Sequence, residues 1–168
     1  MLTSNETGFF PYTPATNLLY GLDESLAMLK EEGLVNTLRR HAHLARATRA
    51  AVVAWGLENF CLEPSGFSST QTTVKMPDGT DADALRKIIL ERFDMSLGSG
   101  LGKLKGGVFR IGHLGDINEL TVAGTLCGVE MGLGLAGVPH RPGGVRAALE
   151  VFSTQGGERE EQTRSVEH

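Results

Sequence analysis

Apolar residues recur at helical spacing along the first third of the chain. Leu18, Leu22, Leu26 and Leu29 fall on one face of a helix that runs from Leu18 to about Glu32. A glycine at position 33 interrupts this pattern, and a second helical pattern follows over residues 34–55. The sequence therefore predicts two consecutive helices, with a break between them.

The middle of the chain alternates strand and helix signals. A run of β-branched residues predicts a strand over residues 72–76, and the stretch Pro77-Asp78-Gly79 predicts a turn. A helix is expected from about Asp81 to Phe93, followed by a short strand near Met95. After the glycine-rich segment 98–107, the stretch "GVFRIGH" predicts another strand.

The last predicted helix reaches about Ala136. Asp116, with Glu119 three residues later, resembles an acidic capping box and predicts its start. The resulting order ααβαββα indicates an α+β fold, a short sheet with helices packed on one side. The expected core consists of Val74, Leu85, Ile89, Phe109, Ile111 and Leu120.

The two ends of the chain lack regular patterns. Residues 1–17 contain prolines, Gly8 and small polar residues beside Phe9, Phe10 and Tyr12, which indicates an irregular segment that must nevertheless pack. From position 153 onward the chain is polar and has little to bury, so a disordered tail is expected. The predicted organisation is a lead-in (1–17), connecting helices (18–56), a small α+β domain (57–150) and a tail (151–168).

Composition narrows the functional classes. The chain has 168 residues and a net charge of −4, and its basic residues are scattered, so no nucleic-acid-binding surface is expected. No apolar run approaches the roughly 18 residues of a membrane span. Two distant cysteines and the absence of a secretory signal favour a soluble protein in a reducing cytoplasm.

Most short motifs fail on inspection. The glycines at 98, 100 and 102 do not continue as G-x-G-x-x-G because Lys103 occupies the third glycine position, so a mobile hairpin or lid is expected instead. His41 and His43 are two residues apart on a helix and do not form an i, i+4 metal pair, and no metal site is predicted. Cys61 and Cys127 are expected to be small core residues rather than nucleophiles.

Arg110 is the strongest candidate for chemistry, because it is a charged residue within a strand of Val108, Phe109 and Ile111. A buried charge requires a partner. One interpretation is a structural ion pair with Asp116 or Glu119. The other is a functional guanidinium that binds the carboxylate of an amino or keto acid through two parallel hydrogen bonds.

Three long blocks resemble a known family. "GFFPYTPATNLLYGLDESLAMLKEEGL", "RHAHLARATRAAVVAWGLE" and "GVFRIGHLGDINELTVAGTLCGVEMGL" are similar to the C-terminal part of class V, alanine-glyoxylate-like pyridoxal-phosphate aminotransferases, in particular the serine-glyoxylate type. The resemblance covers roughly residues 1–150. It implies the small C-terminal domain of the aspartate-aminotransferase-like (fold type I) fold, and transfer of the amino group of serine to glyoxylate, giving hydroxypyruvate and glycine.

The resemblance also implies roles for single residues. Arg110 would hold the α-carboxylate of small amino-acid and 2-oxo-acid substrates. Thr13, and less directly Tyr12, would reach the phosphate of pyridoxal 5'-phosphate in the other subunit of a homodimer. The lead-in would lie against the large domain and the dimer interface. Without them, six of its apolar residues should face water and promote self-association: Phe9, Phe10, Tyr12, Leu18, Leu19 and Leu22.

No catalytic residue of the family is expected within these 168 residues. The lysine that forms the Schiff base lies upstream of the matching segment in family members, and none of the five lysines here has its sequence context. The chain is therefore expected to be inactive alone. A second hypothesis is a non-catalytic small domain that binds a carboxylate ligand or a protein partner.

Overall fold

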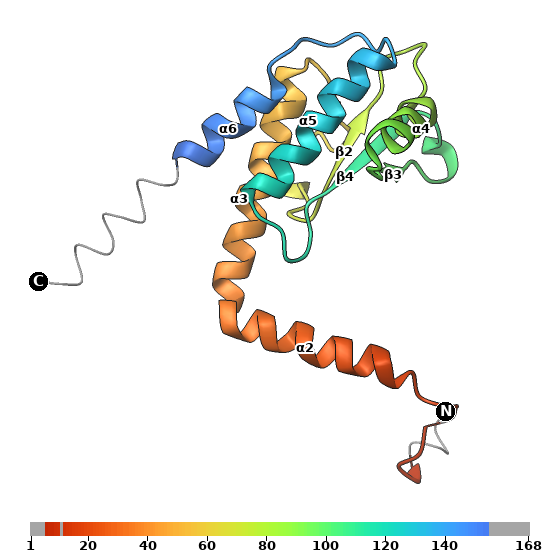
Figure 1. Cartoon of the computed structure of the whole chain (residues 1–168), viewed down its shortest axis with the longest axis vertical. Coiled ribbons are helices and arrows are strands. Elements are labelled where there is room, and N and C mark those ends of the chain that lie inside the picture. The colour runs from red at the N-terminus through yellow and green to blue at the C-terminus, as the bar shows by residue number, and fades with distance from the viewer. Residues whose placement is uncertain (1–5, 11, 155–168) are drawn as a thin grey trace, which may run out of the picture. The chain divides into compact units, whose positions relative to one another are not determined.

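The computed structural model describes residues 6–10 and 12–154 (Figure 1). The chain divides into two compact units, Met1–Thr37 and Leu38–His168. No helix of the described part is long and apolar enough to span a membrane.

The first unit contains helix α2 (Thr16–Glu32). Its end is set by Gly33, whose φ of 83° favours glycine and whose N–H donates to the carbonyl of Leu29. This confirms the predicted break between two helices. None of the 17 residues of α2 is buried. The exposure predicted for Phe9, Phe10, Tyr12, Leu18, Leu19 and Leu22 is also confirmed.

The second unit contains an antiparallel sheet of four strands in the order β1-β2-β4-β3. The long central pair is β2 (Gln71–Lys75) and β4 (Val108–Gly112), flanked by β1 (Glu58–Asn59) and β3 (Gly98–Ser99). The register places Arg110 of β4 opposite Thr73 of β2 on one side and Gly98 of β3 on the other.

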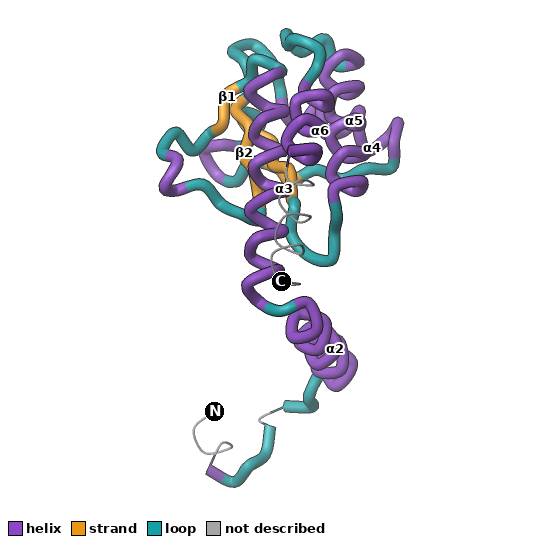
Figure 2. Tube along the Cα trace, turned by 90° about the vertical axis from the view of Figure 1, so that its left-hand side faces the viewer, coloured by secondary structure: helices purple, strands orange, loops and turns teal. Residues whose placement is uncertain are grey.

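Helices cover one face of this sheet. They are α3 (Leu34–Ala54), α4 (Ala82–Phe93), α5 (Glu119–Leu135) and α6 (Gly144–Thr154), with short 3-10 turns at Pro64–Gly66 and Gly102–Leu104. Figure 2 shows the strands on one side of the unit and α4, α5 and α6 together on the other. Sheet and helices share one apolar core, so the predicted α+β class, a short sheet with helices on one side, is confirmed. The largest buried side chains include Trp55, Leu85, Ile89, Phe109, Ile111 and Leu126.

Two predicted elements and one predicted core residue differ in position. α5 begins at Glu119 rather than after Asp116, because the side chain of Asn118 accepts a hydrogen bond from the N–H of Thr121 and caps the helix. The short strand lies at Gly98–Ser99 instead of near Met95, whose side chain packs against the core. Leu120, predicted to be in the core, is 81% exposed.

Helix α6 was not predicted. Its first turn is capped from a distance by Glu130 of α5, which accepts hydrogen bonds from the N–H groups of Gly143 and Val145 at 3.0 Å each. The same carboxylate accepts the indole N–H of Trp55 at 2.8 Å. α6 continues through Thr154, so the first residues of the predicted disordered tail are helical. The rest of that tail lies outside the described residues.

Candidate functional site

Successive side chains of β4 point to opposite faces of the sheet, which explains how a charged residue fits into an apolar strand. Phe109 and Ile111 point into the core and are fully buried. Arg110 lies between them, so its side chain leaves the opposite face of the sheet, and it is partly buried there. The strand therefore places a guanidinium on the face that the helices do not cover.

The guanidinium of Arg110 has one protein partner in the part of the chain that the structure describes. Its Nη1 donates to the side-chain oxygen of Gln71 at 3.2 Å. Its Nε is buried and has no hydrogen-bond partner among the residues that the structure describes. The described residues give Arg110 no ion pair, so the first interpretation, a structural pair with Asp116 or Glu119, is not observed. A partly buried cation that is not paired with a protein carboxylate can bind the carboxylate of a ligand.

Neighbouring strands determine the surroundings of Arg110. On β2, Gln71 lies on the same face, and its amide nitrogen donates to the hydroxyl of Thr73 at 3.3 Å. On β3, Gly98 lies directly opposite Arg110. A β-carbon added at Gly98 would come within 2.9 Å of the Arg110 β-carbon and 3.0 Å of its Nε. Gln71 was not predicted from the sequence, and Gly98 only as part of the glycine-rich segment, because their contacts with Arg110 depend on the strand register.

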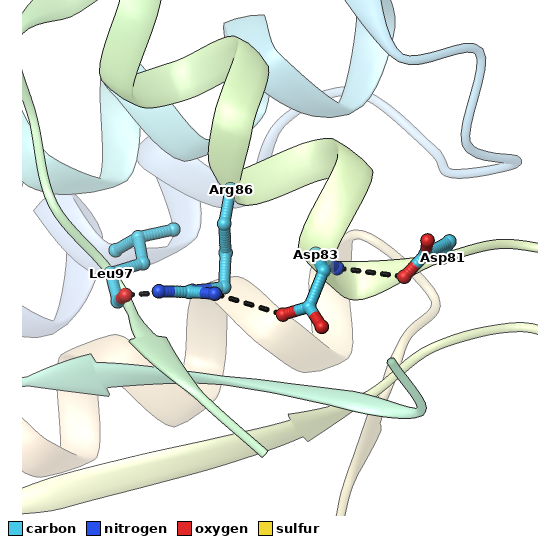
Figure 3. Close-up of polar contacts among 4 residues, drawn as sticks. All are labelled: Asp81, Asp83, Arg86 and Leu97. Carbon is cyan, nitrogen blue, oxygen red and sulfur yellow. Dashed lines mark hydrogen bonds and ion pairs between the residues drawn. The ribbon is translucent and has the colours of Figure 1, made fainter. Parts of the chain in front are cut away.

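The entry to β3 is fixed by Arg86 of α4. Figure 3 shows its guanidinium between two acceptors: Nε donates to the carbonyl of Leu97, and Nη1 donates to the carboxylate of Asp83, both at 2.8 Å. Asp83 is itself held at the start of α4, where its N–H donates to the side chain of Asp81. The residue immediately before Gly98 is therefore tied to the helix.

The glycine-rich segment contributes an edge strand of the sheet. Gly98 pairs in β3, and a 3-10 turn follows over Gly102–Leu104. Gly100 is buried so closely against the carbonyl of Leu104 that a side chain would collide with it. The segment thus provides a hairpin arm beside Arg110, which confirms the predicted hairpin, whereas its mobility stays a prediction.

A buried histidine lies at the end of β4. In the neutral ring, the Nδ1–H of His113 donates to the carbonyl of Ser69 at 3.1 Å and its Nε2 accepts from the hydroxyl of Thr72 at 2.9 Å. Burial lowers the pKa of His113 to about 4, although the hydrogen bond to the Ser69 carbonyl acts in the opposite direction. His113 is therefore neutral at pH 7 and supports the strand that carries Arg110.

The two residues suggested for cofactor contact lie in the first unit. Tyr12 and Thr13 precede α2 and are exposed, with 82% of Tyr12 accessible. Their hydroxyl groups can each donate to a phosphate oxygen. Two hydroxyls provide phosphate contacts only, so these residues fit part of the cofactor and do not form a complete pocket for it.

The remaining sequence candidates have structural roles or none. His41 accepts from the N–H of Gly115, and His43 packs edge-on against Phe152. Within residues 6–10 and 12–154, no group of three or more His, Cys, Asp or Glu side chains could hold a metal ion. Cys61 and Cys127 are both exposed, so the prediction that they are core residues is wrong.

Comparison with curated proteins identifies close relatives. The chain is 51% identical over 145 residues to serine–glyoxylate aminotransferase of Methylorubrum extorquens, and 48% identical over 144 residues to the protein of that name from Arabidopsis thaliana. In both cases the match covers 86% of this chain and 36% of the relative. The chain thus spans little more than a third of the length of these relatives. No family model matches the sequence.

Solved structures of aminotransferases share the fold of this chain. Pyridoxamine-pyruvate aminotransferase from Mesorhizobium loti superimposes with a TM-score of 0.81 at 35% identity, covering 87% of this chain and 38% of that one. Ureidoglycine-glyoxylate aminotransferase from Bacillus subtilis superimposes with a TM-score of 0.78 at 33% identity, covering 84% and 37%. By sequence and by fold, the chain belongs to the class V aminotransferases and corresponds to the C-terminal part of its members.

Proposed function

We propose that this chain is the substrate-carboxylate-binding part of an enzyme that transfers the amino group of serine to glyoxylate, giving hydroxypyruvate and glycine. The observation that carries the proposal is Arg110, a partly buried guanidinium that the described residues supply with an amide oxygen and no carboxylate. The names of the relatives at 48–51% identity support the choice of substrates.

A single arginine can serve both substrates. Serine and glyoxylate each carry a carboxylate next to the carbon that reacts, and a planar guanidinium binds a carboxylate through two parallel hydrogen bonds. Two bonds fix direction as well as distance, so the reacting carbon is held at a defined position relative to Arg110. Such positioning contributes several kcal/mol to many enzymatic reactions.

Pyridoxal phosphate, when bound, supplies the electron sink for amino-group transfer. This chain's own contribution is orientation by Arg110 and, in a homodimer, phosphate contacts from the exposed hydroxyls of Thr13 and Tyr12. The lysine that holds the cofactor in this family is expected from a part of the enzyme outside these 168 residues, so the chain alone is expected to be inactive.

The test is Arg110→Lys in a complete enzyme that carries this segment. Lysine keeps the charge and loses the two-pronged geometry. The transition state should therefore lose about 1.5 to 3 kcal/mol of stabilisation, so that kcat/KM for serine and for glyoxylate falls roughly tenfold to a few hundredfold. Arg146→Lys is the matched control, because Arg146 lies on α6 with 86% of its side chain exposed and its ion pair among the described residues is with Glu150. Unchanged kinetics together with lowered stability would show that Arg110 is structural.

A further inference from the structure

We infer that Gln71 and Gly98 are positioning residues that hold the Arg110 guanidinium with its two terminal nitrogens directed at the substrate carboxylate. The inference rests on the proposed function, because it assigns the support of the same arginine. Neither residue is expected to touch the substrate carboxylate itself. They determine which edge of the guanidinium is accessible to a ligand.

Gln71 fixes one end of the guanidinium. Its side-chain oxygen accepts from Nη1 of Arg110 at 3.2 Å, while its amide nitrogen donates to the hydroxyl of Thr73. The reverse orientation would place the amide nitrogen, a donor, against the Nη1 donor of Arg110, so the oxygen faces Arg110 and the hydroxyl of Thr73 accepts from the nitrogen. Because Nη1 carries two hydrogens, one remains for a ligand after Gln71 has accepted the other.

Gly98 leaves room for the opposite edge of the guanidinium. The Nε of Arg110 is buried and has no partner among the described residues, and a β-carbon at position 98 would stand 3.0 Å from it. Because Nε is buried, a carboxylate cannot approach along the Nε edge. The remaining two-pronged arrangement uses one hydrogen of Nη1 and one of Nη2.

The side chain of Gln71 is uncharged, so it does not neutralise the positive charge of Arg110. A glutamine supplies an acceptor without a negative charge, so it holds Arg110 and leaves the cation available. Glutamate has the same shape but would form an ion pair with Arg110 at this distance and compete with the substrate carboxylate. Gln71→Glu is thus a specific way to block the site without removing the arginine.

Kinetics in the complete enzyme test this directly. Gln71→Glu should raise KM for both serine and glyoxylate about 10- to 100-fold, with kcat changed by less than about threefold. Gln71→Met keeps the length, loses the acceptor and should raise KM by about 3- to 10-fold. Ala84→Glu adds the same charge at an exposed position of α4, on the other side of the sheet, and should change neither constant.

Glycine variants test the second support. Gly98→Ala should weaken carboxylate binding at least about tenfold, because its methyl group would displace the Arg110 side chain. Gly112→Ala is the matched control, since Gly112 lies two residues from Arg110 on the same strand and a β-carbon there meets nothing within 4 Å. Equal KM values for the two alanine variants would overturn the role of Gly98.

Glyoxylate titration of the dilute 168-residue chain, labelled with ¹⁵N-arginine, gives a readout independent of turnover. The Nε–H signal of Arg110, identified by its loss in Arg110→Lys, should move on titration in the unsubstituted chain and respond at least about tenfold more weakly in Gln71→Glu. If Arg110→Lys is harmless and the signal does not move, the proposed function fails. If Arg110 responds but Gln71→Glu leaves KM and the titration unchanged, the positioning inference alone is overturned.

Discussion

Helices α2 and α5 have the same length and very different environments. α2 exposes Leu18, Leu22 and Leu26 by 75%, 55% and 55%, whereas α5 buries Leu126 and Leu133 completely. The sequence predicts α2 from the spacing of its leucines and α5 from a capping pattern at its start. A helical repeat of leucines therefore indicates that a face needs covering, but it does not tell whether the same chain provides the cover.

The second unit and helix α2 differ in what stabilises them. The second unit closes its own core between sheet and helices, so its stability should be internal. α2 buries nothing and ends with a glycine cap, and a helix of this kind gains little from propensity alone. We expect the exposed face of α2 to be covered by the rest of a complete enzyme or by a second subunit.

The same substitution in both helices gives the largest expected contrast. Leu126→Ala should lower the free energy of unfolding by about 2 to 5 kcal/mol, because it leaves a cavity in the core. Leu26→Ala in α2 should change it by less than about 0.5 kcal/mol, since the side chain is already in water. Urea denaturation followed by circular dichroism measures both. A large effect of Leu26→Ala would show that α2 is covered within the chain.

A second prediction concerns the polar link between α5, α6 and Trp55. Glu130→Gln should cost about 1 to 3 kcal/mol of stability, because an amide offers fewer acceptor sites to the N–H groups of Gly143, Val145 and Trp55. Glu150→Gln, which breaks an exposed pair with Arg146, should cost less than about 0.5 kcal/mol. Thermal unfolding of both variants provides the comparison, and equal losses would contradict the capping role of Glu130.

Acidification should also act through Glu130. Burial tends to raise the pKa of this carboxyl group, but the hydrogen bonds from Gly143, Trp55 and Val145 outweigh it, and the pKa is lowered. A carboxyl group with a lowered folded pKa contributes stability above its unfolded pKa and loses it as the pH falls through the folded value. Glu130→Gln should therefore be less sensitive than the unsubstituted chain to acid below the usual glutamate range.

His113 should make the second unit sensitive to mild acid. Its folded pKa is about 4 and its usual value 6.5, so the unfolded chain binds the proton first as the pH falls. Stability should be complete above about pH 6.5 and decrease toward pH 4, by about 1 to 2 kcal/mol at pH 5. Unfolding at pH 7 and pH 5 measures this loss. In His113→Gln the loss between these two pH values should shrink, and an unchanged loss would assign it to other groups.

Local signals explain which elements the sequence predicts well. α4 begins at Ala82 after Asp81, whose side chain accepts from the N–H of Asp83, so both the cap and the helix are encoded within a few residues. The start of α5 is different. Arg40 of α3 donates to the carbonyls of Gly115 and Ile117, which holds this stretch outside the helix. That contact joins distant parts of the chain and cannot be read from a capping pattern.

Helix α6 and the exposed Leu120 show the same limit. The prolines and glycines before α6 indicate a loop, and the helix start depends on Glu130 from another element. α5 is apolar on nearly every side, so its sequence does not reveal which face is buried, and Leu120 was placed inward wrongly. Tertiary contacts decide both cases.

The residues of the candidate site also differ in how well the sequence predicts them. Arg110 is visible in the sequence because a charge within an apolar strand demands a partner. Gln71 and Gly98 become its neighbours only through the pairing of β2, β4 and β3. A register shift of one residue would turn each of these side chains to the other face of the sheet. The residue that carries the chemistry is thus predictable, and the residues that support it are not.

The smallest expected effect on stability belongs to residues 1–17, although their effect on association should be large. Phe9, Phe10 and Tyr12 are exposed by 76%, 66% and 82%, and burying a large apolar side chain is worth about 1.5 to 3 kcal/mol. The isolated chain should therefore self-associate with increasing concentration. Deleting residues 1–17 should reduce this association while changing the free energy of unfolding of the second unit by less than about 0.5 kcal/mol, because none of its core residues is removed.

Light scattering over a concentration series tests this prediction, with deletion of the polar residues 155–168 as the control that should leave association unchanged. A full-length chain that stays a single monomeric species would mean that the apolar face of α2 and the lead-in is covered within the chain. That result would favour a stand-alone carboxylate-binding domain over a segment that requires the rest of an enzyme. Association that persists after the deletion would instead place the contact on α2 itself, where Leu22→Ser and Leu26→Ser should then abolish it.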